Sequence, residues 1–264
     1  MKKTRYATLV IVVIMLLIIT VPAAAVTDGE PDGNGHPYVG MYYFSDPDGD
    51  WRCSGTLLSP TVFLTAGHCT FEAFNARVAF ESEITDDSTW YSGVAYSFPG
   101  YATGPWFAND VGVVILKKPG IKNLEVYGEL PKADQLDSLA TERGQQDITF
   151  TAVGYGLQQI VDNPVWGPIH LQADKVRMVA NPKLNQINAP GFTGDYSLLL
   201  SNNHSTGGTC FGDSGGPNFL GDSNVVAGVT SFGMNGNCGG TGGVFRVDRQ
   251  EVLDFVQSFL GKKK

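Results

Sequence analysis

The sequence has few cysteines, and they do not follow a metal-binding pattern. Its 264 residues include four cysteines, and no two of them form a C-x-x-C pair. The usual spacing of a structural zinc site is therefore missing. If the chain is exported, an even number of cysteines instead predicts two disulfides, with three possible connectivities. The four are Cys53, Cys69, Cys210 and Cys238.

Basic residues are also scarce. The chain has 18 Lys and Arg against 26 Asp and Glu. Three of the basic residues and none of the acidic ones lie in the first 25 positions, so the remainder has a formal charge of −11. An acidic surface excludes nucleic acid and anionic membranes as expected partners, because both repel it. The three lysines at 262–264 are too few to form a membrane-binding patch.

Long hydrophobic runs are absent after residue 25. Before it, Lys2, Lys3 and Arg5 precede an apolar run from Ala7 to Val21, and three alanines end at residue 25. This arrangement predicts a signal peptide over 1–25, cut before Val26, and hence a secreted, extracellular protein. The alternative is an uncleaved membrane anchor, for which the apolar run is short, since a span needs about 20 residues.

Helical periodicity is nearly absent as well. Short runs rich in Val, Ile, Phe and Tyr, such as 38–44, 110–117 and 224–233, alternate with Gly, Pro, Asn and Asp. This pattern predicts an all-β protein. A polar segment interrupts it, and we expect a first β unit over 26–130, a linker over 131–146 and a second unit over 147–247. A helix and basic tail are expected over 248–264.

Two stretches rich in aspartate raise the question of calcium. Asp28, Glu30, Asp32 and Gly33 match the opening of an EF-hand loop, but Val39 stands where the loop requires glutamate. The second stretch, 46–50, lacks that glutamate too. Turn chemistry accounts for both stretches. We therefore expect no metal and no cofactor.

Three motifs contain residues suited to one reaction. His68 ends the apolar run "VFLTAGHC", Asp110 begins "NDVGVVIL", and Ser214 lies among glycines in "GDSGGP". Each residue alone has an ordinary structural explanation. Together they supply what a serine nucleophile requires, namely an imidazole to accept its proton and a carboxylate to orient that imidazole.

On these motifs, and on "SFG" (231–233) and "GGVFRV" (242–247), the chain after residue 25 resembles the chymotrypsin-like (trypsin-fold) serine proteases. The resemblance implies two antiparallel six-stranded Greek-key β-barrels with the active site in the cleft between them. It also implies Ser214 as nucleophile, His68 as general base and then acid, and Asp110 as the group that orients His68. The N–H groups of Gly212 and Ser214 would form the oxyanion hole.

The same resemblance pairs the cysteines and gives Val26 a role. It implies a Cys53–Cys69 bridge beside the histidine and a Cys210–Cys238 bridge beside the specificity pocket. Because other bridges of animal members are missing, we expect a microbial source. "VTDG", which starts at Val26, resembles the new amino end of active family members, whose ammonium pairs with the aspartate before the serine, here Asp213. Signal-peptide cleavage would create that end directly.

The resemblance also suggests what is cut. It places five residues around the primary pocket, and none of them is charged: Gly208, Thr209, Ser231, Gly233 and Gly243. We expect cleavage after large apolar or aromatic residues, with a narrower, elastase-like preference as the alternative. Glutamate specificity through His204 is a third possibility that the sequence does not support.

Parts of the sequence also fit other functions. "GDSGG" also fits the G-x-S-x-G elbow of α/β-hydrolases, but there the serine precedes the acid and the histidine. The remaining histidines, His36, His170 and His204, lie in no comparable motif. A catalytically silent binding protein of the same fold and a serine esterase remain alternatives. The expected partners are protein or peptide substrates, bound by a monomer.

Overall fold

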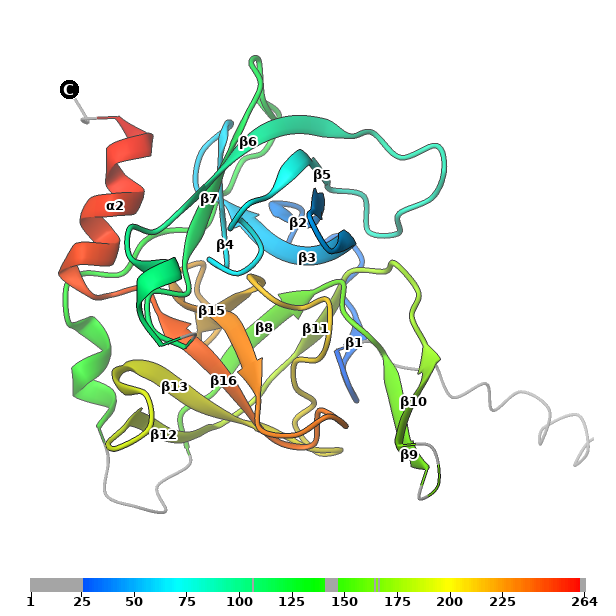
Figure 1. The fold of residues 1–264 in the computed structure, drawn as a ribbon, viewed down its shortest axis with the longest axis vertical. Helices are drawn as coiled ribbons and strands as arrows, with labels where there is room; N and C mark the ends of the chain where they lie inside the picture. The colour runs from blue at the N-terminus through cyan, green and yellow to red at the C-terminus, as the bar shows by residue number, and fades with distance from the viewer. Residues whose placement is uncertain (1–25, 106, 141–146, 164, 166, 262–264) are drawn as a thin grey trace, which may run out of the picture.

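In a computed structural model, the chain forms two β units with a helix at its C-terminal end (Figure 1). The structure describes residues 26–105, 107–140, 147–163, 165 and 167–261. The expected signal peptide, the lysine tail and part of the expected linker lie outside these residues. Among the described residues, no helix is long and apolar enough to cross a bilayer.

The first unit is a closed six-stranded barrel with the order β2-β3-β4-β7-β6-β5. Apolar side chains on its strands, such as Tyr42, Phe63 and Leu64, are fully buried and fill its interior. The strands are β2 (Val39–Asp46), β3 (Gly49–Leu57), β4 (Val62–Thr65), β5 (Phe74–Ala79), β6 (Tyr91–Ser97) and β7 (Gly112–Leu116).

The second unit is an eight-stranded antiparallel sheet with the order β1-β11-β8-β14-β15-β16-β13-β12. A separate hairpin, β9 (Gln159–Asn163) and β10 (Gly167–Gln172), projects from the body of the molecule (Figure 1). The sheet strands are β1 (Glu30–Pro31), β8 (Phe150–Gly154), β11 (Met178–Ala180), β12 (Leu184–Ala189), β13 (Gly194–Asn202), β14 (Pro217–Leu220), β15 (Val226–Gly233) and β16 (Gly240–Arg246).

The all-β class with two barrel-like units and a C-terminal helix is confirmed. The details differ where polar residues or proline hide a strand. The sequence pattern did not indicate β9, β12 or β14, and β14 begins at a proline that follows two glycines. Proline is tolerated as the first residue of a strand, where its missing N–H costs least.

The two ends of the chain each join the unit built by the other half. Near the start, β1 pairs with β11 of the second sheet. At the end, helix α2 (Gln250–Leu260) packs against the first barrel, where Phe255 meets Phe98 edge to face and Phe259 contacts Tyr96. Two short 3₁₀ helices complete the described elements: η1 (Tyr101–Thr103) and η2 (Gln135–Leu139).

Candidate active site

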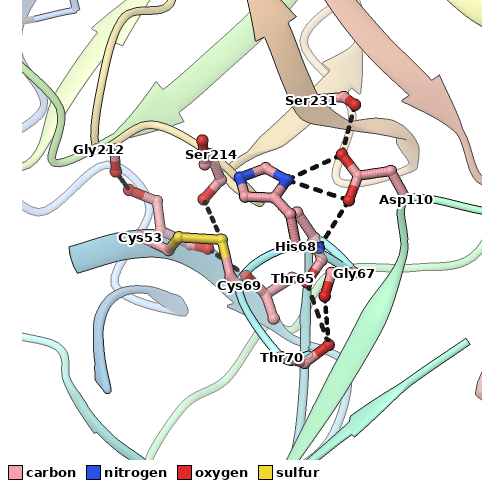
Figure 2. Close-up of a disulfide and its surroundings, with 12 residues drawn as sticks. Cys53, Thr65, Gly67, His68, Cys69, Thr70, Asp110, Gly212, Ser214 and Ser231 are labelled. Atoms are coloured by element: carbon pink, nitrogen blue, oxygen red, sulfur yellow. Dashed lines mark hydrogen bonds and ion pairs between the residues drawn. A yellow bond between two sulfur atoms is a disulfide. The ribbon is translucent and has the colours of Figure 1, made fainter. Parts of the chain in front are cut away.

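His68 and Asp110 are brought together by two paired strands of the first barrel. His68 follows the end of β4, and Asp110 precedes the start of β7. Because β4 and β7 are antiparallel and Thr65 pairs with Gly112, the two residues lie at the same edge. The imidazole Nδ1 is 3.1 Å from Asp110 Oδ1 and 3.0 Å from Oδ2 (Figure 2). The His68 backbone N–H also donates to Oδ1, at 2.8 Å.

The carboxylate of Asp110 is buried, with 1% exposure, and it accepts hydrogen bonds from three donors. Besides the two donors of His68, the hydroxyl of Ser231 donates to Oδ2 from the second unit. This environment acts on His68. Burial lowers the pKa of His68, but the charge of Asp110 and its hydrogen bond outweigh burial, so the net pKa lies above the ordinary 6.5.

Ser214 lies on the other side of the imidazole from Asp110 (Figure 2). Both Ser214 and His68 line one cleft of about 480 Å³. The other residues that line it come from the second unit: Thr209, Cys210, Phe211, Thr230, Ser231, Phe232, Gly233, Asn235, Gly236 and Cys238. None of these other residues carries a charged side chain.

The backbone around Ser214 has a shape that requires glycine. Gly212 has φ +94° and Gly215 has φ +77°, a region that side chains disfavour. A Cβ on Gly215 would stand 2.0 Å from Thr65 Oγ1. The first barrel thus approaches this loop too closely for any other residue.

Strand β3 of the first barrel holds the same loop through Ser54, which sequence reasoning did not single out. Its N–H donates to the Ser214 carbonyl at 2.8 Å, and its hydroxyl donates to the Gly212 carbonyl at 2.9 Å. The hydroxyl also accepts from the Tyr155 N–H at 2.9 Å. The only sequence signal was its place next to Cys53, since an isolated serine has no motif.

Asp213 points into the protein. It is 1% exposed, and its carboxylate accepts from the N–H groups of Gly156 and Cys210, each at 2.8 Å. Burial raises the pKa of Asp213 to about 7, although these two hydrogen bonds and the charge of Arg52 act in the opposite direction. Among the described residues, no side-chain cation forms an ion pair with Asp213.

Val26 is fully buried beside Met178 and Ala180. Its φ is +52°, a strained value for a β-branched residue. The next residue, Thr27, pairs with Gly208 in an isolated bridge and accepts the Gly208 N–H at 3.0 Å. The start of the described chain therefore lies against the segment that leads to Ser214, while the Val26 nitrogen is still a peptide amide in the 264-residue chain.

The structure contains the two disulfides that the resemblance implies. Cys53, on β3, is joined to Cys69 beside the histidine, and Cys210 is joined to Cys238 across the cleft. Cys53, Cys69 and His68 lie close enough to suggest a metal site. Both sulfurs are in a disulfide, however, and a metal needs thiolates.

The five expected pocket residues divide into two groups. Thr209, Ser231 and Gly233 line the cleft, whereas Gly208 and Gly243 do not. A Cβ on Gly243 would stand 2.3 Å from the ring of Phe232, so that glycine lies beneath the ring. The neighbouring Gly242 faces Thr209, because a Cβ there would be 3.2 Å from Thr209 Oγ1.

The aspartate-rich stretches, His36 and His204 have structural partners. Asp32 binds His36 and Arg177, and Asp46 accepts the N–H groups of residues 48 and 49. The exposed His204 pairs with Asp28 at 2.6 Å, and neither residue lines the cleft. The side chain of His170 lies outside the described residues.

Comparison with known proteins identifies the family of the chain. A sequence model of the family described as Trypsin matches residues 26–256. "Serine protease 1" of Drosophila melanogaster is 28% identical over 221 residues, covering 81% of this chain and 77% of that protein. "Collagenase" of Hypoderma lineatum is 27% identical over 220 residues, covering 79% and 76%.

Solved structures show the same fold. A structure titled HL collagenase superposes with a TM-score of 0.69 at 22% identity, covering 90% of this chain and all of that chain. A scabies mite inactivated protease paralogue gives 0.66 at 19% identity, covering 90% and 99%. A two-unit β fold with a histidine, a buried aspartate and a serine at one cleft defines a class of serine protease. By the family match, this chain belongs to the trypsin family.

Proposed function

We propose that this chain is a secreted serine endopeptidase that works through an acyl-enzyme, with His68, Asp110 and Ser214 as its triad. One observation carries the proposal: the imidazole bonded to the buried Asp110 carboxylate shares a cleft with the Ser214 side chain. The trypsin family supplies the reaction class. The relatives named above are animal proteins, and the microbial source stays a prediction.

The residues divide the reaction between them. Ser214 Oγ attacks the carbonyl carbon of the peptide while His68 Nε2 takes the hydroxyl proton. His68 then gives this proton to the departing amine as the carbon–nitrogen bond breaks, leaving an acyl ester on Ser214. Water then attacks the ester with His68 again as base, and His68 returns the proton to Ser214 Oγ as the acyl–oxygen bond breaks and the acid product leaves. Asp110 holds the Nδ1 proton and stabilises the positive charge on His68 throughout, without taking that proton.

The backbone N–H groups of Gly212 and Ser214 would bind the oxygen that becomes negative. Such donors lower the transition-state energy because they are already in place when the charge develops. Two features favour this role: the left-handed Gly212 and the hydrogen bond from Ser54 to its carbonyl. A side chain at residue 212 would strain that geometry.

Cleavage before Val26 would complete the site. Asp213 is buried with a raised pKa, which is the condition of a carboxylate that lacks a cation. A new ammonium at Val26 is the expected partner, and the chain next to it already pairs with Gly208. Cutting the bond before Val26 also removes the carbonyl that makes φ +52° unfavourable for valine. Both effects favour insertion of the free end.

The substrate preference that we propose is for uncharged side chains. Apart from His68, the residues that line the cleft are uncharged, and Phe211 and Phe232 add apolar surface. A lysine or glutamate side chain would enter this cleft without a counterion, which is unfavourable. Apolar residues of the substrate lose no such interaction.

The first test is an intact-mass spectrum of the secreted protein before and after treatment with a fluorophosphonate, with Ser214→Ala as control. We expect a mass that starts at Val26 and a single adduct that maps to Ser214. A folded protein that starts at Val26 and does not react would indicate a binding protein instead. A protein that reacts with the fluorophosphonate but, when untreated, cleaves esters and not peptides would be an esterase.

A further inference from the structure

The side chain of Asn202 fills the space in which a side chain at residue 208 would lie. Asn202 ends β13 and is 2% exposed. A Cβ on Gly208 would stand 2.2 Å from Asn202 Cγ and 2.3 Å from its Oδ1. Atoms that are not bonded do not approach so closely. The space beside residue 208 is therefore a shared volume. It holds either the Asn202 side chain or a side chain at position 208, but not both.

The orientation of this carboxamide is fixed at both ends. Thr27 Oγ1 donates to Asn202 Oδ1 at 2.8 Å, and Asn202 Nδ2 donates to the Thr209 carbonyl at 2.8 Å. The Gly208 N–H donates to the Thr27 carbonyl at 3.0 Å. A buried amide group is costly without partners, so the two side-chain bonds hold Asn202 in place, while the backbone bond holds Thr27 beside Gly208.

Asn202 lies directly behind a wall of the cleft. The carbonyl that it holds belongs to Thr209, which lines the cleft together with His68 and Ser214. Thr209 Oγ1 faces Gly242 of β16, and Asn202 itself pairs with Gly240 of the same strand. Asn202 is thus enclosed between the start of the described chain, the segment 208–209 and β16.

We propose that Asn202 sets the depth of the primary pocket, closing it behind Thr209 with a neutral carboxamide that Thr27 holds in place. The pocket then accepts uncharged side chains of medium length. A longer side chain meets the carboxamide, and a charged one finds no counterion there. This inference rests on the proposed endopeptidase function, because it assigns the specificity of that same cleft.

The first experiment measures kcat/KM of Asn202→Ala on peptides that differ only in the residue before the cut bond: Val, Leu, Phe, Tyr and Lys. Removing the carboxamide deepens the pocket, so we expect the Phe-to-Val ratio to rise about tenfold, which corresponds to about 1.4 kcal/mol. An unchanged ratio in a folded variant would overturn the proposal. Asn203→Ala, at the exposed neighbouring position, is the matched control and should leave the ratio unchanged.

Thr27 allows a second, milder comparison. Thr27→Val keeps the shape of the side chain and removes the hydroxyl that holds Asn202, so the same ratio should rise about threefold, a difference of well under 1.4 kcal/mol. Thr27→Ser restores the hydroxyl and should restore the original ratio. Equal ratios in the two Thr27 variants would show that the hydroxyl does not hold the pocket floor.

The shared volume predicts an exchange between positions 202 and 208. Gly208→Asp alone should be destabilised, because its side chain meets Asn202. In the double variant Gly208→Asp with Asn202→Ala, the new carboxylate takes the space that the carboxamide leaves, so the protein should fold. The carboxylate supplies the missing counterion, so this variant should cleave after Lys and Arg, which neither single variant does. Failure of the double variant to gain this activity, when it is folded and reacts with a fluorophosphonate, would contradict the proposal.

Stability separates this inference from the proposed function. In a Ser214→Ala background, Gly208→Ala should lower the melting temperature strongly when Asn202 is present and little when residue 202 is alanine. This coupling needs no catalysis. If the Ser214→Ala variants show the coupling but the wild-type protein has no peptidase activity, the endopeptidase function is refuted. The shared volume of positions 202 and 208 is then still supported. An active protein without the coupling would refute the role of Asn202.

Discussion

Asp32 and Asp213 both have carboxylates with little exposure to solvent, but the Asp213 residue is the more deeply buried, and their partners differ. Burial raises the pKa of both. For Asp32, hydrogen bonds from His36 and Arg177 outweigh burial, and the net pKa lies below 3.8. For Asp213, two backbone N–H groups and the charge of Arg52 do not suffice, and the pKa rises to about 7. Asp32 has a direct cation partner, whereas Asp213 has none among the described side chains and is also the more deeply buried.

The Asp32 region is complete as it stands. The guanidinium of Arg177 donates to Asp32, to the carbonyls of Gly33, Val39 and Phe80, and to the hydroxyl of Tyr155. Its bonds therefore join the start of the described chain to both β units. The Asp213 region lacks such a cation, so it is the one that a new amino end can change. The comparison separates a permanent structural charge from one that responds to cleavage.

Removing the cation that pairs with Asp32 should have the largest effect, which is on stability. Arg177→Met leaves Asp32 buried without its cation, which is expected to cost about 3–5 kcal/mol of unfolding free energy. Urea unfolding in a Ser214→Ala background measures this loss at neutral pH. Because the pKa of Asp32 is lowered in the folded state, its contribution to stability is present above pH 3.8 and disappears as the pH falls further.

The control is Arg249→Met. Arg249 pairs with Asp134, whose side chain is 61% exposed, so its removal should cost less than about 1 kcal/mol. Equal losses of unfolding free energy in the two variants would show that burial does not make the Arg177–Asp32 pair stronger than the exposed Arg249–Asp134 pair.

Preventing the Val26 ammonium from pairing with Asp213 should have the next largest effect, which is on activity. A variant with one alanine before Val26 retains a peptide bond at the Val26 nitrogen and cannot present its ammonium to Asp213. We expect kcat/KM to fall by about 10²–10³-fold, the loss typical of a disordered oxyanion site. In Asp213→Asn, the same extension should have little further effect, since the ion pair is already missing. Full activity of the extended protein would refute the pair.

The extended protein also has a predicted pH dependence. The folded pKa of Asp213, about 7, lies above its ordinary value of 3.8, so the folded state binds more protons between these limits. Stability should fall as the pH rises from about 4 to about 7. In the protein that starts at Val26, the ammonium should abolish most of this decline. Urea unfolding of both forms in the Ser214→Ala background tests the difference.

A smaller loss is expected from Ser54→Ala. The variant removes the hydroxyl that holds the Gly212 carbonyl and leaves the buried Tyr155 N–H without its acceptor. We expect kcat to fall about tenfold, equivalent to about 1.4 kcal/mol, with KM nearly unchanged. Ser258→Ala, on the exposed face of α2, is the control. A rise in KM alone would assign Ser54 to substrate binding.

The smallest effect concerns a third buried carboxylate, Asp110. Its charge raises the pKa of His68, so kcat/KM should rise with pH through a midpoint above 6.5, as His68 loses its proton. Ser231→Ala removes a donor to Asp110 and should raise this midpoint further, by a fraction of a pH unit. A midpoint below 6.5 in the native protein would contradict the argument.

Sequence reasoning found the fold class and the motif residues because both rest on local patterns. Alternating short apolar runs predicted strands, and His68, Asp110 and Ser214 each lie in a motif of several residues. It did not find Ser54, Asn202 or Arg177. Each of these makes a contact with a residue 145 to 175 positions away, and no neighbouring residue signals them.

The pocket shows the same limit. A motif places Gly243 near the cleft, but the ring of Phe232 decides which of two adjacent glycines faces Thr209. A shift of one residue along a strand reverses the face of the sheet, and only the pairing register settles it. The side chain that fills the space at Gly208 comes from another strand, so its identity could not be inferred from position 208.

The exchange of chain ends between the two units has a mechanical consequence. The half of the chain up to residue 140 contributes β1 to the second sheet, and the half from residue 147 contributes α2 to the first barrel. Each half therefore lacks a piece that the other supplies. Two fragments expressed separately should recover their full structure only when mixed, and in the intact molecule the walls of the cleft resist being pulled apart.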